Sequence, residues 1–249
     1  DWQIDIDDVA RVVDGNTRLI ATTLVSNVNG YLSDIAALSD LAHAHGAYIY
    51  VDIIQGAGAV PIDVRAMGID FAACSTFKWL MGVKGFGFLY VREDLQGSVA
   101  KPTQHCGGVS FEYPPWRAPP HSAADIAFAP VSGPGMYEVS YPSYEGAVSA
   151  QVSLRYILDL GIDHIRAHAR ELTDRLQREM PALGYPSITP EDNESPIVSC
   201  VAADPEATMA RLKQAGVHVA LRFGNKIRIS PSVYNNHQDL DRLLAALPQ

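Results

Sequence analysis

The chain has 249 residues, of which 47% are hydrophobic and 19% are charged, the composition of a globular rather than a disordered protein. No apolar run approaches the roughly 18 residues that a membrane-spanning helix needs. A formal net charge of −9 disfavours a partner with a phosphate backbone, so we expect neither a membrane nor a nucleic acid as partner.

Short apolar runs alternate with helical patterns in the first part of the chain, which is typical of βα units around a mostly parallel sheet. Residues 17–25 are apolar and β-branched, as in a buried strand. Ser33 and Asp34 then precede an amphipathic helix that Gly46 closes. Three further strands are predicted, at residues 47–51, 71–74 and 87–91.

The composition shifts at residues 102–142 to Pro, Gly, Ser and aromatics, which indicates a functional loop or a domain crossing. Beyond it, two helices broken near Gly161 are predicted over residues 145–180, followed by a β-α-β-β-α order at 197–201, 205–215, 217–221, 226–230 and 237–247. We therefore predict an α/β protein. Residues 1–142 form part of a large domain with a mostly parallel sheet, and residues 143–249 form a small C-terminal α+β domain with its linking helices.

The three cysteines, Cys74, Cys106 and Cys200, lie far apart without a Cys-x-x-Cys pair. This pattern argues against a disulfide framework or a zinc site and favours a reducing, cytoplasmic location. His164 and His168 are spaced i, i+4, but no third ligand lies near them in the sequence. We interpret them as a solvated helix face and expect no metal site.

Two glycine-rich stretches resemble nucleotide-binding loops but lack decisive residues. Gly56-Ala57-Gly58 follows a strand, yet Pro61 stands where the dinucleotide fingerprint needs a third small residue. Residues 82–85 lack the Gly-Lys-Ser/Thr of a phosphate loop. Neither stretch predicts a nucleotide site.

Four polar residues follow two of the predicted strands: Asp52, Gln55, Ser75 and Lys78. Because carboxyl ends of parallel strands line the ligand crevice of open α/β sheets, we expect Asp52 and Lys78 to converge there. A lysine facing a carboxylate suits pyridoxal phosphate (PLP) chemistry, in which the amine condenses with the cofactor aldehyde and the carboxylate keeps the pyridine nitrogen protonated. The spacing equally suits an Asp that caps a turn and a surface Lys in a loop, so it leaves both interpretations open.

Longer runs of sequence resemble a known family. Residues 51–64 contain Val-Asp-x-x-Gln-Gly-Ala-Gly and Pro-Ile-Asp-Val, and residues 75–91 contain Ser-x-Phe-Lys and Gly-x-Gly-x-Leu-Tyr-Val. Residues 25–30 (Val-Ser-Asn-Val-x-Gly) and 228–235 (Arg-x-Ser-x-Ser-x-Tyr-Asn) belong to the same pattern. The chain thus resembles, over nearly its whole length, the class V aminotransferase family. This is the fold-type I PLP group that includes cysteine desulfurases, selenocysteine lyases and isopenicillin N epimerase-like proteins.

The resemblance implies a role for each matching residue. Lys78 would form the Schiff base with PLP, and Asp52 would pair with the pyridinium nitrogen. Arg228 would clamp the substrate carboxylate, a task that suits its planar fork. The other cofactor contacts would come from Gln55 at the ring hydroxyl, Ser75 at the phosphate, Asn27 at the rim, and Tyr141 in place of a Thr that reaches the partner subunit's phosphate. Such enzymes are usually homodimers with sites built from both subunits.

Departures from the family pattern bear on the reaction. Phe77 stands where cysteine desulfurases carry a His, and residues 217–226 contain no Cys where those enzymes carry their nucleophile. Cys74 and Cys200 lie in apolar strand patterns, so we expect core positions. Persulfide transfer therefore lacks its nucleophile. We predict an aminotransferase acting on an amino acid, with a β-eliminating lyase or an epimerase as alternatives that share the same carbanion.

The sequence opens on Asp-Trp-Gln-Ile-Asp, which reads like the interior of a domain and has no signal-peptide pattern. The family's first part precedes anything present here. That part includes the helix whose N-terminus cradles the phosphate and the aromatic residue stacked on the pyridine ring. We therefore expect a longer parent protein to be the active enzyme, and a truncated non-catalytic homologue is the competing interpretation.

Overall fold

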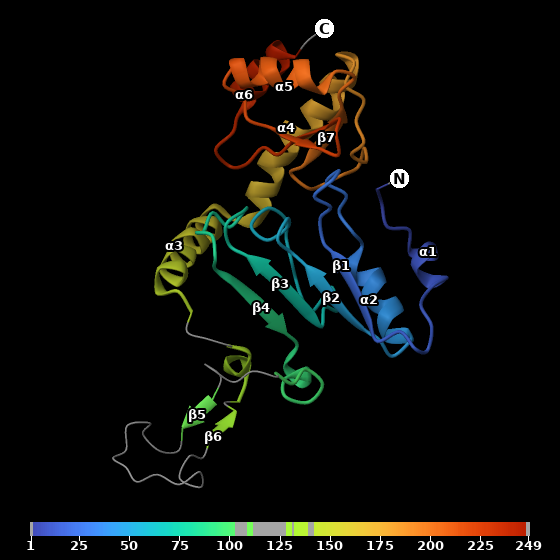
Figure 1. The fold of residues 1–249 in the computed structure, drawn as a ribbon, viewed down its shortest axis with the longest axis vertical. Coiled ribbons are helices and arrows are strands. Elements are labelled where there is room, and N and C mark those ends of the chain that lie inside the picture. Colours follow the sequence, from blue (N-terminus) through green and yellow to red (C-terminus); the bar gives the residue numbers. More distant parts are fainter. Residues whose placement is uncertain (1, 103–108, 112–127, 131, 139–141, 248–249) are drawn as a thin grey trace.

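The computed structural model describes residues 2–102, 109–111, 128–130, 132–138 and 142–247. These residues form a mixed α/β structure with a four-stranded, a three-stranded and a two-stranded sheet (Figure 1). The elements in chain order are α1 (Ile6–Ala10), β1 (Leu19–Thr23), α2 (Ile35–Ala44), β2 (Tyr48–Asp52), β3 (Phe71–Ser75), β4 (Gly87–Val91), β5 (Val109–Phe111), β6 (Phe128–Pro130), α3 (Tyr144–Leu160), α4 (Ile162–Ala182), β7 (Val198–Val201), α5 (Pro205–Gln214), β8 (Ala220–Arg222), β9 (Lys226–Ile229) and α6 (His237–Ala246).

The larger sheet has the strand order β1-β2-β3-β4, with β1, β2 and β3 parallel and β4 antiparallel to β3. Its registers place Thr23 beside Asp52 and Asp52 beside Ala73, so β1 and β2 end together and β3 continues two residues further, to Ser75. Alternate side chains such as Ile49 and Val51 are fully buried in a core that also includes buried residues of α2. The sheet therefore presents the polar ends of its parallel strands at one common edge.

The second sheet, β7-β9-β8, is antiparallel and buries one face in a separate hydrophobic core with α4, α5 and α6. In Figure 1 this group lies above the larger sheet, α3 lies beside that sheet, and α4 leads from it into the group. Ile157 of α3 and Ile165 of α4 are buried in the core of the larger sheet. Residues 142 and 143 directly precede α3, and the division into two domains there stays a prediction.

The helix boundaries follow the local signals in the sequence. The Asp34 carboxylate accepts the N–H of Ala37 at 3.0 Å and begins α2. Gly46 and Gly161 adopt φ values of +70° and +81°, which favour glycine and end α2 and α3. The predicted mostly parallel α/β arrangement is therefore present, and its helices are where periodicity and capping residues indicate.

One predicted strand is displaced. Residues 217–221 are expected as a strand, whereas β8 covers Ala220–Arg222. The pairing partner β9 ends at Ile229, and the two strands are joined across a turn at Phe223 and Gly224, so the ladder spans only residues 220–222. Periodicity alone misses this limit because it is set by the partner strand.

The helices of the described residues include none that is long and apolar enough to cross a bilayer. The two longest, α3 and α4, are amphipathic instead. α3 buries Ala150 and Ile157 but leaves Val148, Val152 and Leu158 exposed. One side of α3 is thus packed against the protein and the other is an apolar surface.

The buried carboxylate of Asp70 joins three elements at the opposite end of the larger sheet from the polar strand ends. Its Oδ2 accepts the N–H of Ile49 at 2.9 Å and contacts His43 Nε2 of α2 at 2.9 Å. Its Oδ1 pairs with the Arg92 guanidinium, which also bonds Asp94 at 2.6 Å. Asp70 is completely buried, so these partners compensate the cost of removing its charge from water.

Candidate active site

The segment after β3 is a closed loop that presents Lys78 at the carboxyl edge of the sheet. Gly82 N donates to Thr76 O at 2.8 Å, and Met81 N donates to Lys78 O at 2.9 Å. The buried Thr76 hydroxyl bonds the carbonyl oxygens of Val83 and Phe86, at 3.2 and 3.1 Å. Backbone bonds therefore fix the position of Lys78 while its side chain stays half-buried.

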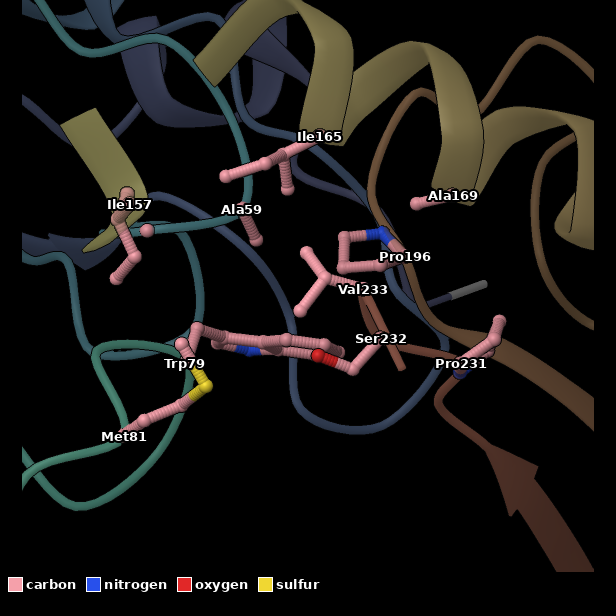
Figure 2. A pocket seen from close by; sticks show the side chains of 11 residues that line it. Ala59, Trp79, Met81, Ile157, Ile165, Ala169, Pro196, Pro231, Ser232 and Val233 are labelled. Atoms are coloured by element: carbon pink, nitrogen blue, oxygen red, sulfur yellow. The ribbon is translucent and has the colours of Figure 1, made fainter. Parts of the chain in front are cut away.

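The neighbouring Trp79 anchors this loop to the rest of the site. Its indole N–H donates to Gln55 Oε1 at 3.2 Å. Figure 2 shows the Trp79 ring facing Val233 and Ala59 in a small apolar cavity between the α3–α4 region and residues 231–233. That cavity has a volume of about 10 Å³, about the space that one water molecule occupies. It is therefore a small gap in the packing that is too small to hold a substrate.

Gly58 approaches the Trp79 backbone closely, and it also has a φ of +91°. A Cβ at Gly58 would stand 2.9 Å from the Trp79 carbonyl oxygen. A Cβ at Gly82 would stand 2.7 Å from Thr76. Gly58 and Gly82 are therefore both required by close packing around the Lys78 loop.

We expect Gly58→Ala to destabilise the protein by about 1–3 kcal/mol, because it combines a left-handed backbone with a clash against Trp79. Gly85→Ala is the matched control, since Gly85 has a φ of +84° but no neighbouring atom within 4 Å of the position that an added methyl carbon would take. Urea denaturation of the two variants measures the difference. Equal losses of unfolding free energy in the two variants would show that the close contact between Gly58 and the Trp79 backbone does not add to the cost of the substitution.

Asp52 and Ser75 lie on one face of the sheet, at the ends of β2 and β3. Both line an open cleft of about 850 Å³, together with Tyr50, Ala73 and Gly87. The Asp52 Oδ1 accepts the N–H of Ile54 at 2.9 Å, which fixes the carboxylate at the strand end. The cleft thus has the polar groups predicted for it at its edge.

The charges around Lys78 show which side chains converge. Burial lowers the pKa of the Lys78 ammonium, and Asp52 opposes that shift because its carboxylate favours the charged amine. Arg228 and Arg222 lower the Lys78 pKa further. The influence of Asp52 agrees with its place on the strand beside β3, which leads into the Lys78 loop.

Arg228 reaches the site from β9. Its Nη1 donates to the main-chain oxygen of Asn27 at 2.7 Å, so the two predicted site residues are in contact. The buried Nε has no hydrogen-bond partner among the described residues. Burial, with a smaller contribution from Arg222, lowers the pKa of Arg228. A half-buried, partly unsatisfied guanidinium is the feature expected of an anion-binding group.

The loop that carries Asn27 is fastened to the second sheet. The Ser199 hydroxyl donates to Val28 O at 2.5 Å, and the Ser195 hydroxyl donates to Gly30 O at 2.6 Å. Gly30 has a φ of +79°, and a Cβ there would stand 2.3 Å from the Ile197 oxygen. Both sheets therefore contribute residues to one site.

Most predicted site residues are thus brought together. Asp52 and Ser75 line the cleft at the sheet edge, Lys78 follows Ser75 by three residues, and Arg228 contacts Asn27. Gln55 is buried beneath, with its oxygen bonded to Trp79. Tyr141 lies outside the described residues. The sequence motifs do not indicate Arg222, which the register of β8 and β9 places on the same face of the hairpin as Arg228.

Two cysteines and two histidines that the sequence analysis singled out lie among the described residues. Cys74 and Cys200 are buried, as predicted, and burial raises the pKa of Cys74 to about 11 and that of Cys200 to about 12. His164 Nδ1 and His168 Nε2 contact the carbonyl oxygens of Leu160 and Asn235, at 3.1 and 2.9 Å. Within the described residues no three His, Cys, Asp or Glu side chains gather as a metal site.

Comparison with known proteins identifies the family of this chain. The sequence profile of the family described as "Aminotransferase class-V" matches residues 1–243. The chain belongs to this family. In sequence it is similar to the "Uncharacterized aminotransferase YcbU" of Bacillus subtilis, with 25% identity over 92% of this chain and 58% of the relative.

Solved structures confirm the fold of this class-V chain. The apo structure of a cysteine desulfurase from Thermococcus onnurineus superimposes with a TM-score of 0.85 at 23% identity, over 98% of this chain and 62% of that one. A C-DES mutant with glycine covalently linked to its PLP cofactor has a TM-score of 0.81 at 19% identity, over 96% of this chain and 62% of that one. The fold is that of the fold-type I PLP-dependent enzymes, and the chain spans about three fifths of the length of these relatives.

Proposed function

We propose that the chain carries the PLP- and substrate-binding residues of an enzyme that acts on an amino acid, with Lys78 bonded to the cofactor. The observation that carries the proposal is the placement of Asp52 and Ser75 at the ends of neighbouring strands, directly before the Lys78 loop, in a class-V chain. The donor set fits PLP: an amine for the aldehyde, a carboxylate for the ring nitrogen and a hydroxyl, Ser75, for the phosphate.

Each residue has a chemical task in this proposal. Lys78 takes and returns the substrate α-proton, and its lowered pKa increases the fraction of neutral amine that accepts a proton. Asp52 holds a proton on the pyridine nitrogen. Arg228 binds the substrate carboxylate, with its Nη1 fixed by Asn27. PLP, when bound, supplies the electron sink for the carbanion at the substrate α-carbon.

Gln55 and Tyr141 complete the proposed contacts, at the ring hydroxyl and at the phosphate of a partner subunit. For Gln55, support comes from the bond to Trp79: it occupies the amide oxygen and leaves the amide nitrogen without a hydrogen bond among the described residues. An amide N–H₂ is the donor that a ring hydroxyl oxygen requires. The proposed contact therefore uses the end of the side chain that remains available.

Transamination is the reaction we propose, and β-elimination or epimerisation are the alternatives. A cysteine desulfurase shares the fold, which keeps a lyase among these alternatives. Against sulfur transfer stand the burial of Cys74 and Cys200, which raises the pKa of both thiols, and the lack of a cysteine in residues 217–226. A desulfurase nucleophile would have to be an accessible thiolate.

The test uses the full natural polypeptide loaded with PLP and a panel of amino acids. Keto acid formed from the added amino acid supports transamination, pyruvate or released sulfide supports a lyase, and the inverted enantiomer supports an epimerase. Absence of any visible absorbance band from bound PLP at saturating cofactor would refute the proposed function altogether and favour a non-catalytic homologue.

We expect Asp52→Asn to retain PLP but to reduce turnover by about 10²–10³-fold, because it removes the one charge that holds the ring nitrogen protonated. Asparagine keeps an oxygen for the N–H of Ile54, so the strand end is preserved. Steady-state kinetics with the natural polypeptide measure the loss, and an Asp63→Asn variant in an exposed turn serves as control. Unchanged turnover of Asp52→Asn would remove Asp52 from the proposed site.

A homodimer and a cytoplasmic location belong to the same proposal. The homodimer is supported by the family, and the location by the absence of paired cysteines in the sequence. Light scattering of the natural polypeptide measures its mass in solution. A monomeric mass together with full activity would contradict the shared-site arrangement.

A further inference from the structure

The hairpin of β8 and β9 gathers three cations on one face. Ala220 is opposite Arg228 and Arg222 is opposite Lys226, so Arg222, Lys226 and Arg228 share a side of the sheet. Ile227 and Ile229 alternate with them and are buried in the core on the other side. The cationic side faces the larger sheet, since Arg228 bonds Asn27 there.

Two of these three cations already contact other residues of the chain. Arg228 donates to Asn27 O, and Lys226 lies 6.0 Å above the Trp2 ring, with its Nζ 3.5 Å from Asn225 Oδ1. Arg222, by contrast, has no hydrogen bond or ion pair with any residue in the described part of the chain. Its guanidinium is therefore available to an external anion.

The position of Arg222 is set by the hairpin turn. Phe223 and Gly224 adopt φ values of +46° and +81°, and the Phe223 ring packs against Trp2 with centroids 5.3 Å apart. The register pairs Ala220 with Arg228 and Arg222 with Lys226, so Arg222 and Arg228 are diagonal neighbours on one face of the hairpin. Like charges held together in this way repel unless an anion lies among them.

We propose that Arg222 binds a second anionic group of the substrate, so that the preferred substrates are dicarboxylic amino acids. Arg228 then takes the α-carboxylate and Arg222 takes the side-chain carboxylate, each through charge-assisted hydrogen bonds. This inference rests on the proposed function, because it assumes that Arg228 faces the substrate. In this proposal the β8–β9 hairpin selects the substrate. Arg222 lies within residues 217–226, the segment that contains no cysteine.

Lys226 provides the matched control. It shares the face and the strand pair of Arg222 but is directed to Trp2. Lys226→Gln and Arg222→Gln thus remove the same charge from the same hairpin, and only the second removes the proposed contact. Arg222→Lys retains the charge without the planar fork, so it separates a general electrostatic effect from bidentate binding.

The test is isothermal titration calorimetry of the full natural polypeptide loaded with PLP, using succinate, glutarate and butyrate. These acids lack an amino group, so binding is measured without turnover. We expect the wild-type protein to bind a dicarboxylate at least about tenfold more tightly than butyrate, the effect of one charge-assisted contact. Arg222→Gln removes that preference without changing butyrate binding, Lys226→Gln changes neither, and Arg222→Lys restores part of the preference.

Three results would overturn the inference. They are equal binding of dicarboxylates and butyrate by the wild-type protein, an Arg222→Gln variant that keeps the preference, and an Arg222→Gln variant that loses affinity for PLP instead. Thermal unfolding of each variant identifies any loss of fold. The proposed function fails separately, if PLP gives no absorbance band with the wild-type protein, so the two failures are distinguishable.

Discussion

Replacing Lys78 by alanine is expected to reduce turnover by about 10³-fold or more and to remove the absorbance band of lysine-bound PLP. Lys78 is the proposed attachment point and the proposed proton carrier, and positioned acid–base groups alone contribute about 10²–10⁴-fold. Its backbone is fixed by the Met81–Lys78 bond and its neighbour Trp79 is anchored, so the loop should survive the truncation. Stopped-flow absorbance and steady-state kinetics with the natural polypeptide measure both effects.

Lys84 supplies the control for this prediction. It is the other lysine of the segment, it is exposed, and it precedes the turn at Gly85. Lys84→Ala should therefore leave both the absorbance band and turnover within a factor of about two, as expected of an exposed substitution. If Lys84→Ala lost the band and Lys78→Ala kept it, the assignment of the attachment point would be wrong.

Asp70→Ala is expected to lower the free energy of unfolding by about 3–5 kcal/mol, because it removes one partner of a buried charge cluster. The substitution leaves the Arg92 guanidinium and the N–H of Ile49 without their buried acceptor. Asp70 lies at the start of β3, whereas the candidate site lies at its end. The activity per folded molecule should therefore be retained at low temperature, which separates this effect from those of site variants.

The neighbouring ion pair of Arg92 and Asp94 tests whether the burial of Asp70 causes the large loss of unfolding free energy. The Asp94 side chain bonds the same guanidinium at 2.6 Å but is 64% exposed. Asp94→Ala should cost about 1 kcal/mol or less, the value of a surface ion pair. Urea denaturation of both variants gives the comparison, and equal losses would mean that burial of Asp70 does not decide its contribution.

The sequence predicts the sheet edge well because local signals dictate it. Asp52 and Ser75 end β-branched or apolar runs, and parallel strands bring such ends to one edge whatever the loops between them do. Capping at Asp34 and the breaks at Gly46 and Gly161 are equally local. For these elements, propensity, periodicity and capping agree with the tertiary structure.

Other features depend on partners that a single sequence does not identify. The bounds of β8 follow from where β9 ends, and the role of Arg222 follows from the resulting register. The bond between Trp79 and Gln55 and the burial of Asp70 need long-range packing. The two-domain division and the role of Tyr141 remain predictions.

Borohydride reduction tests most directly the proposed covalent link between the cofactor aldehyde and the Lys78 amine. The full natural polypeptide is loaded with PLP, reduced, digested and analysed by tandem mass spectrometry. We expect fragment ions to locate a phosphopyridoxyl group on the side chain of Lys78 and none on that of Lys84. A modification located on another lysine, or an unmodified Lys78 at saturating PLP, would contradict the proposed link.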